Sequence, residues 1–171
     1  MINTDSNIPN DEIWYTSSDG NIVTPSNVES LPLIVSNIYV NGKGIIKFET
    51  DVIIETHAFA YCKNLTSITI PNSMTYIGNR SFRDCSSLTA VTIPNSVTVI
   101  RGYAFYGCSS LTSVTIPNSV RTIQEGVFSQ CTKLRNISYK DTIARWNTIS
   151  KTNPWHIVGI IVHCTDGDVE I

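Results

Sequence analysis

Five cysteines are the residues of this chain best suited to covalent or metal chemistry. Cys62, Cys85, Cys108 and Cys131 recur at a constant interval of 23 residues, and the fifth is Cys164. Zinc sites bring cysteines together from different directions, whereas one position in stacked coils points its side chains the same way. Stacking would also bring neighbouring Cα atoms to about 5 Å, a disulfide distance, but with parallel Cβ vectors that disfavour the disulfide torsion. We therefore expect four buried free thiols that pack as small apolar side chains.

The other candidate reactive groups do not form a recognisable site. His57, His156 and His163 have no spacing that would place a metal ion or a general base. Asp166-Gly167-Asp168 lacks the length and the later carboxylate of a calcium loop, so this segment is predicted to be a hairpin turn. The sequence thus predicts no catalytic residues, no metal and no cofactor, and a protein that is not an enzyme.

The cysteine interval is one part of a repeat that runs through the middle of the chain. LTSITIPNSMTYIGNRSFRDCSS, residues 65–87, is followed directly by LTAVTIPNSVTVIRGYAFYGCSS and LTSVTIPNSVRTIQEGVFSQCTK. The same 23-residue step relates Leu65, Leu88, Leu111 and Leu134, and also Phe59, Phe82, Phe105 and Phe128. A fixed period of this length is the signature of a solenoid, in which each repeat buries its apolar side only against its neighbours.

Each repeat is predicted to form one coil of three pieces. Residues 65–70 alternate apolar and Ser/Thr side chains as a strand with one buried face does, and Pro71 ends that strand. Met74 and Ile77 mark a second extended piece, and Ser81-Phe82-x-x-Cys85 marks a helical turn. Coils stacked about 4.8 Å apart would pair their strands in parallel. The predicted fold is therefore a β-rich α/β solenoid.

The sequence pattern of the repeat resembles that of a known family. LTSVTIPNSV…I…AF..CSS resembles the BspA-like bacterial surface-antigen branch of the leucine-rich repeats, over about residues 44–139. One departure is that the general repeat has Asn or Cys where this chain has Ser73, Ser96 and Ser119, so we expect no buried asparagine ladder. The resemblance implies a cell-surface or secreted recognition and adhesion protein, with protein or glycan ligands that include extracellular-matrix proteins. The alternative is a structural spacer that has no ligand of its own.

Both ends of the stack are predicted to carry β-hairpin caps. Residues 1–43 would form an N-terminal tail and a hairpin in which 13–16 and 21–23 flank Ser18-Asp19-Gly20. Residues 44–139 would be the solenoid, whose degenerate first coil begins at Gly44. Residues 140–171 would be a C-terminal cap, with a short helix capped by Asp141 and then a hairpin.

Two surfaces are candidates for ligand binding. The outward strand positions form a Ser/Thr lattice that includes Ser67, Thr69, Thr92, Ser113 and Thr115. Such a lattice is either a binding face or an ordinary solvated face of good strand-forming residues. On the more varied opposite side, the best anchor-like cluster comprises Arg101, Tyr103 and Tyr106, because Arg and Tyr are frequent at the centres of interfaces.

Charge and hydropathy limit the classes of partner. The chain has 12 basic and 14 acidic residues with no basic stripe, so nucleic acid is not an expected ligand. No apolar run reaches the roughly 20 residues of a membrane helix, and the polar start MINTDSNIPNDE contains no signal-peptide core. We expect a monomer.

Overall fold

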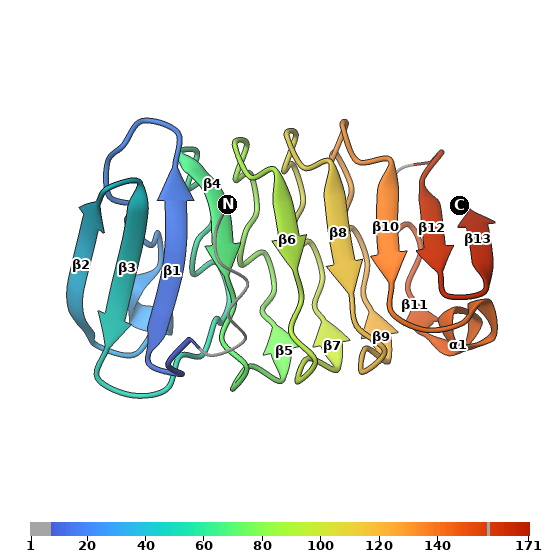
Figure 1. Ribbon diagram of the computed structural model, residues 1–171, viewed down its shortest axis with the longest axis horizontal. Coiled ribbons are helices and arrows are strands. Elements are labelled where there is room, and N and C mark those ends of the chain that lie inside the picture. The colour runs from blue at the N-terminus through green and yellow to red at the C-terminus, as the bar shows by residue number, and fades with distance from the viewer. Residues whose placement is uncertain (1–7, 157) are drawn as a thin grey trace.

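The computed structural model describes residues 8–156 and 158–171, which form a solenoid with a cap at each end (Figure 1). Coils of 23 residues stack along the long axis, and from residue 88 on each coil contributes a strand to each of two mainly parallel sheets. The predicted fold class is confirmed. One sheet contains β6 (Ala90–Thr92), β8 (Ser113–Ile116) and β10 (Asn136–Tyr139), and the other contains β5 (Tyr76–Ile77), β7 (Val99–Ile100), β9 (Thr122–Ile123) and β11 (Ser150–Lys151).

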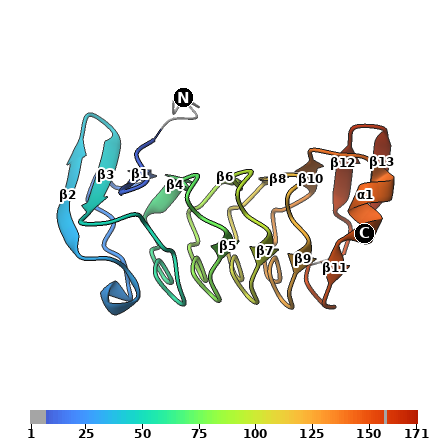
Figure 2. The same ribbon diagram turned by 90° about the horizontal axis from the view of Figure 1, so that it is seen from below.

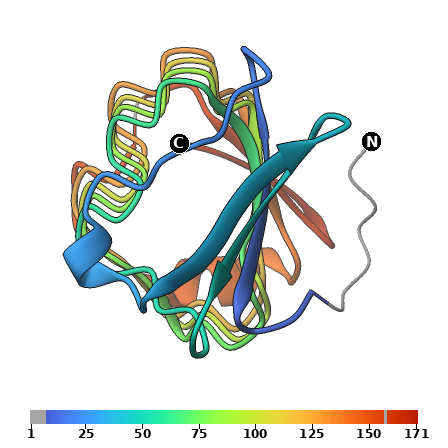
Figure 3. The same cartoon turned by 90° about the vertical axis from the view of Figure 1, so that its left-hand side faces the viewer.

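The register of the strands follows the period of the sequence. Val91 pairs with Val114 and Val114 with Ile137, each one repeat apart. Because every coil places the same residue type at the same position, the coils superimpose when viewed along the stack (Figure 3). The two parallel sheets form two sides of each coil, as Figure 2 shows from below. The outward side chains of each strand therefore form rows across the stack.

The core is a set of ladders of identical side chains. Phe59, Phe82, Phe105 and Phe128 are buried and stack nearly parallel, with successive ring centroids 5.6, 5.3 and 5.7 Å apart. The leucines at the starts of the strands, Leu65, Leu88, Leu111 and Leu134, are fully buried beside them. Full burial of a Leu or Phe side chain contributes about 1.5–3 kcal/mol, so the ladders account for much of the stability of the stack.

The four in-register cysteines lie in the same core, as the sequence predicts. Each is a free thiol, and three of them donate a hydrogen bond to the phenylalanine carbonyl of the preceding coil at 3.0–3.1 Å. The first thiol, Cys62, instead donates to the carbonyl of Thr24 in the N-terminal segment at 3.3 Å. Buried thiols thus connect each coil to the one before it.

The helical turns form a third line of hydrogen bonds between coils. Phe59 N donates to Ser81 O, Phe82 N to Ala104 O and Phe105 N to Val127 O. Each of these turns contains two residues with positive φ, at fixed positions of the repeat. They were not predicted from the sequence. One ladder is His57, Arg80, Tyr103 and Gly126, and the other is Tyr61, Asp84, Gly107 and Gln130.

The N-terminal cap differs from the prediction. β1 (Glu12–Ser17) does not form a hairpin with residues 21–23; it lies between β3 (Lys43–Phe48) and β4 (Leu65–Thr69) and is antiparallel to both. The N-terminal hairpin joins β2 (Ile34–Val40) to β3, and the short 3-10 helix η1 (Val28–Ser30) precedes it. The predicted first coil is therefore also wrong at its start, because β3 belongs to this antiparallel sheet and not to the parallel stack.

The N-terminal sheet closes the first coil. Ile13, Tyr15, Ile46 and Phe48 turn their side chains to the core and are at most 1% exposed. Figure 3 shows the β2–β3 hairpin crossing this end of the stack. Tyr15 therefore closes the core at this end, whereas Trp14 points to the opposite face of the sheet and is only half-buried.

The C-terminal cap contains the predicted helix and hairpin. Helix α1 (Ile143–Thr148) buries Trp146, which packs edge-on against Tyr139 and Trp155. Its N-cap is Thr142, whose hydroxyl accepts from Arg145 N at 3.3 Å, and not Asp141 as predicted. β12 (Ile161–Cys164) continues the sheet in parallel beside β10, and β13 (Gly167–Glu170) pairs antiparallel with β12, so the predicted C-terminal hairpin is confirmed.

Candidate functional site

The predicted Ser/Thr lattice lies on the outer face of the strand sheet. The strand register places Thr92, Thr115 and Ser138 in one row, and Ala90, Ser113 and Asn136 in a second. Thr92 and Ser113 are exposed and Thr115 is half-buried. The inward/outward assignment made from the sequence therefore holds on these strands, because Val91 and Val114 between them are buried.

A groove of about 750 Å³ opens on this face, beginning between β4 and β6 and reaching Thr115 on β8 and Lys140 after β10. Thr89 N still donates to Thr66 O at 3.1 Å where the two strands begin. Beyond that bond β4 pairs with β1, while β6 is the edge of the next sheet. Where the two sheets part, Ile68, Ile70, Val91 and Ile93 form an apolar floor between the hydroxyl rows, although each of these side chains is only 2–7% exposed.

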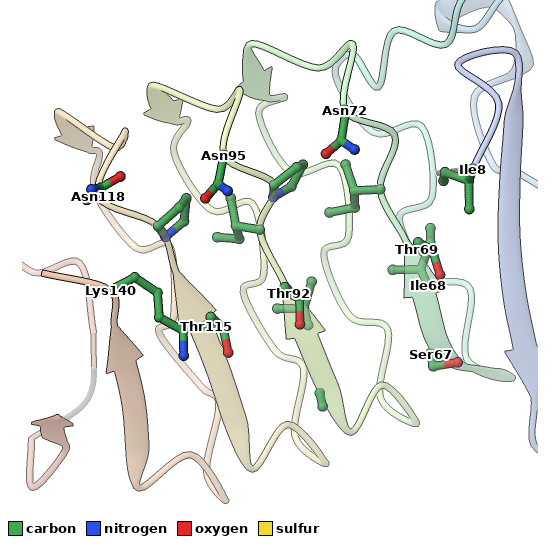
Figure 4. A pocket seen from close by; sticks show the side chains of 16 residues that line it. Ile8, Ser67, Ile68, Thr69, Asn72, Thr92, Asn95, Thr115, Asn118 and Lys140 are labelled. Carbon is green, nitrogen blue, oxygen red and sulfur yellow. The ribbon is translucent and has the colours of Figure 1, made fainter. Parts of the chain in front are cut away.

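The groove combines hydroxyl, amide and apolar groups (Figure 4). Four of the five lattice residues predicted from the sequence, Ser67, Thr69, Thr92 and Thr115, line it. The amides Asn72, Asn95 and Asn118 lie along it at one repeat position, and Ile8 lies at one end. Hydroxyl and amide side chains both donate and accept hydrogen bonds, so this lining suits a neutral, extended ligand that carries donors and acceptors.

Two features of the groove were missed in the sequence. The asparagines carried a signal, since their 23-residue interval places them in one row. The second is Lys140, which occupies the repeat position of Pro71, Pro94 and Pro117 and ends the groove with an exposed cation. The groove is therefore uncharged along its length and positive at one end.

The β4 side of the lattice is held by the cap. Thr16 Oγ1 lies 2.6 Å from both Thr66 Oγ1 and Ser67 Oγ, so the Ser67 hydroxyl is engaged by β1. Trp14 pairs with Thr69 in register, and Lys43 Nζ lies 3.3 Å from the centroid of the Trp14 ring. Ser67 and Thr69 are consequently half-buried, and Thr92, Ser113 and Thr115 carry more of the accessible lattice.

The predicted cluster of Arg101, Tyr103 and Tyr106 lies on the helical-turn side of the coil, away from the groove. Tyr103 and Tyr106 meet edge-on at 6.0 Å, as the sequence suggested, but Arg101 stacks on Tyr76 at 4.0 Å instead. Arg80 covers Tyr103 from the preceding coil, with its guanidinium carbon 5.1 Å from the ring centroid. The aromatic faces are thus occupied within the chain.

Hydrogen bonds shift the pKa values of two side chains around this cluster. Arg83 stacks on Tyr106 at 5.1 Å, and its hydrogen bond to Asp84 raises the pKa of the guanidinium. Tyr76 donates to Glu55 at 2.6 Å, a bond that raises the pKa of the phenol. The cluster therefore helps to hold neighbouring coils together, since each cation–π contact at an exposed site contributes about 0.5–1 kcal/mol of stabilisation.

The histidine furthest along the chain has partners that the sequence did not indicate. His163 Nδ1 lies 2.9 Å from Asp168 Oδ1 on β13, and its Nε2 lies 2.9 Å from Asn136 Oδ1 on β10.

In residues 8–156 and 158–171, no group of three or more His, Cys, Asp or Glu side chains is arranged to hold a metal ion. Within the same residues no helix has the length and apolarity to cross a membrane.

Comparison with known proteins identifies the family. The model of the BspA type leucine rich repeat region matches residues 52–153 in 6 copies, which is more than half of the chain. The chain belongs to this family, as the sequence resemblance indicated. The match begins just after β3, in agreement with the assignment of β3 to the cap.

The solved structure of a leucine rich cell surface protein agrees with this assignment. The chain is 32% identical to a leucine rich cell surface protein from Faecalibacterium prausnitzii A2-165, with a TM-score of 0.50 over 71% of this chain and 42% of that one. It is also 36% identical to a leucine rich repeat protein of T. pallidum, with a TM-score of 0.46 over 50% of this chain and 43% of that one. The chain thus spans less than half the length of these relatives. A search of the curated proteins found no match.

Proposed function

We propose that this chain is a non-enzymatic recognition module that binds an extended protein or glycan ligand along the outer face of its strand sheet. The observation that carries the proposal is the groove between β4 and β6, where the hydroxyl and amide rows border an apolar floor. A neutral polymer with polar edges and an apolar face, such as a polypeptide backbone or a glycan, matches that lining.

The setting proposed for this activity is the cell surface or the extracellular space. It rests on membership of the BspA-type family and on the likeness to a leucine rich cell surface protein. Extracellular-matrix proteins are therefore the first protein ligands to test. The role proposed for the module is adhesion.

The test is a binding screen of the purified chain against matrix proteins and a glycan array. A groove variant carries Thr92→Lys and Thr115→Lys, which fill the groove and add charge to its neutral rows. Thr132→Lys is the matched control, because Thr132 is exposed and does not line the groove. A saturable ligand should lose at least about tenfold in affinity, or about 1.4 kcal/mol, in the groove variant alone.

A third variant, Arg101→Ala with Tyr103→Ala and Tyr106→Ala, tests the helical-turn cluster. If that variant loses binding while the groove variant still binds, and both are folded, the binding site lies on the helical-turn side of the coil. If no ligand binds in either class, the chain acts as a structural spacer, the second function that its regular stack supports.

A further inference from the structure

The free edge of the N-terminal sheet is the longest exposed strand edge among the described residues. β2 is the first strand in the order β2-β3-β1-β4, and no strand of the described residues pairs with its outer side (Figure 1). It has seven residues, Ile-Val-Ser-Asn-Ile-Tyr-Val, and no residue from Leu31 to Val40 is charged. Natural proteins protect such edges with charges, prolines or short strands, since an unprotected edge pairs with another strand.

The side chains of this edge are apolar and exposed. Val35, Ile38 and Val40 are 60%, 51% and 59% exposed. Ile38 also lies in register with Ile45 on β3, and Ile45 with Trp14 on β1, which makes an apolar row that ends at the free edge. This row would become buried if another strand continued the sheet.

The backbone of β2 is arranged to accept a further strand. β2 and β3 are joined by the two-residue turn Asn41-Gly42, in which φ is positive at both residues, 52° and 81°. In such a hairpin the closing pair, Val40 and Lys43, exchanges hydrogen bonds, and the bonded residues then alternate along the strand. The N–H and C=O groups of Asn37 and Tyr39 therefore point away from β3, toward the free edge.

The opposite end of the molecule has a different edge. β13 has only four residues, and two of them, Asp168 and Glu170, are acidic. A β13 edge of one chain that met β13 of another would bring like charges together, which is destabilising. Pairing of β2 with β13 would join chains head to tail in an open filament, and it would place carboxylates along an apolar edge.

We infer that two copies of this chain associate through antiparallel pairing of their β2 strands. This contact is isologous, so it closes as a two-fold dimer, and an uncharged edge faces itself without repulsion. The arrangement that places Ile38 opposite Ile38 of the second copy makes a non-hydrogen-bonded pair, in which side chains lie closest. On both sides of that pair, the main-chain N–H and C=O groups of Asn37 in each chain would form hydrogen bonds with those of Tyr39 in the other chain.

The dimer joins two four-stranded sheets into one continuous sheet of both chains. It covers Ile38 and Val40, and leaves the strand groove free, because the groove lies on the far side of β1 and β4 from β2. The expectation of a monomer, made from the sequence, did not take this edge into account.

Light scattering during size-exclusion chromatography of the full chain, over a wide range of concentrations, tests the inference. The expected result is a mass that rises toward twice the 18.9 kDa of one chain and stops there. Ile38→Lys should raise the dimer dissociation constant at least about tenfold, because two cations then face each other. Ile22→Lys is the matched control, since Ile22 is equally exposed, at 49%, and lies outside β2.

A second variant keeps the test decisive if the lysine disturbs folding. Ile38→Cys should form an intermolecular disulfide under mild oxidation, because the Cα atoms of a non-hydrogen-bonded pair lie about 4.5 Å apart, within the disulfide range. Ile22→Cys should not. A monomeric mass at every concentration, a mass that grows beyond two chains, or a dimer unaffected by Ile38→Lys would each overturn the inference.

Discussion

The Cys108 thiol donates a hydrogen bond to the main-chain carbonyl of Phe82, 3.1 Å away in the preceding coil. The same bond joins Cys131 to Phe105 and Cys85 to Phe59. Since the Phe-x-x-Cys spacing and the 23-residue period are the same in each coil, one side-chain contact is made three times along the stack. The cysteine ladder is thus a structural element, and its chemistry can be tested directly.

Thiol accessibility should separate the ladder from the fifth cysteine. Cys62, Cys85, Cys108 and Cys131 are buried, and Cys164 is half-buried in the cap. In the folded, unreduced protein a thiol reagent should therefore label Cys164 rapidly and the other four only as fast as the chain opens. After unfolding, all five should react. A shortfall of two or four thiols would mean that the ladder forms disulfides.

The ladder should also make stability fall at high pH. Burial raises the pKa of Cys62 to about 11 and that of Cys131 to about 12, above the ordinary value of about 8.5. The folded chain then binds more protons than the unfolded chain above that ordinary value. The stabilisation is complete below about pH 8.5 and is lost as the pH rises toward the folded values.

Urea unfolding of the reduced protein across this pH range measures the effect. The free energy of unfolding should fall with pH, and Cys131→Ala should reduce the slope by roughly 1 kcal/mol per pH unit. Thr132→Ala, which removes no ionisable group, should leave the slope unchanged. A free energy that stays flat or rises from pH 8.5 upward contradicts the burial of neutral thiols.

The phenylalanine stack gives a prediction on packing. Phe105 lies between Phe82 and Phe128 with no exposed surface. Phe105→Ala should therefore lower the free energy of unfolding by about 3–5 kcal/mol. Thr92→Ala, at an exposed strand position, should lower it by well under about 1 kcal/mol. Chemical unfolding of both variants checks this, and equal losses would mean that the inward and outward faces are assigned wrongly.

Much of the stack could be predicted because its information is local and repeated. The apolar positions Leu65, Ile68 and Ile77 recur with one period, and a coil with one buried side must stack. The same period predicts the outward hydroxyls from the sequence alone. It could not show the groove, because the pairing of β4 with β1 joins segments far apart in the sequence and leaves β6 at the edge of the next sheet.

The caps were harder because their sequences are not repeated. Ser18-Asp19-Gly20 reads as a hairpin turn, yet the strand before it finds its partners in β3 and β4. Residues 21–23 are held by other bonds: Ser17 Oγ donates to Asn21 O, and Val23 N donates to the Tyr15 hydroxyl. Tertiary contacts outweighed turn propensity here. In the C-terminal cap, where Cys164 and Gly167 are close in sequence, local signals gave the correct hairpin.

The positive-φ ladders escaped the sequence analysis because glycine occupies few of their positions. At one position of the repeat the residues are Tyr61, Asp84, Gly107 and Gln130, so three coils adopt the left-handed conformation with a side chain. That conformation costs a residue other than glycine about 1–2 kcal/mol. The inter-coil hydrogen bonds, such as Tyr61 N to Arg83 O at 2.7 Å, offset it.

This strain predicts an unusual response at Gln130, which is exposed and has φ of 62°. Gln130→Gly should raise the free energy of unfolding by about 0.5 kcal/mol, since relief of the strain exceeds the entropy that glycine adds to the unfolded chain. Gln130→Val should lower it by about 1–2 kcal/mol, because a β-branched residue tolerates positive φ worst. Thr132→Gly, at an exposed position outside the two ladders, is the control and should be destabilising. Urea unfolding of the three variants measures these differences, and a Gln130→Gly protein as destabilised as Thr132→Gly would show that the turn does not impose the left-handed conformation in solution.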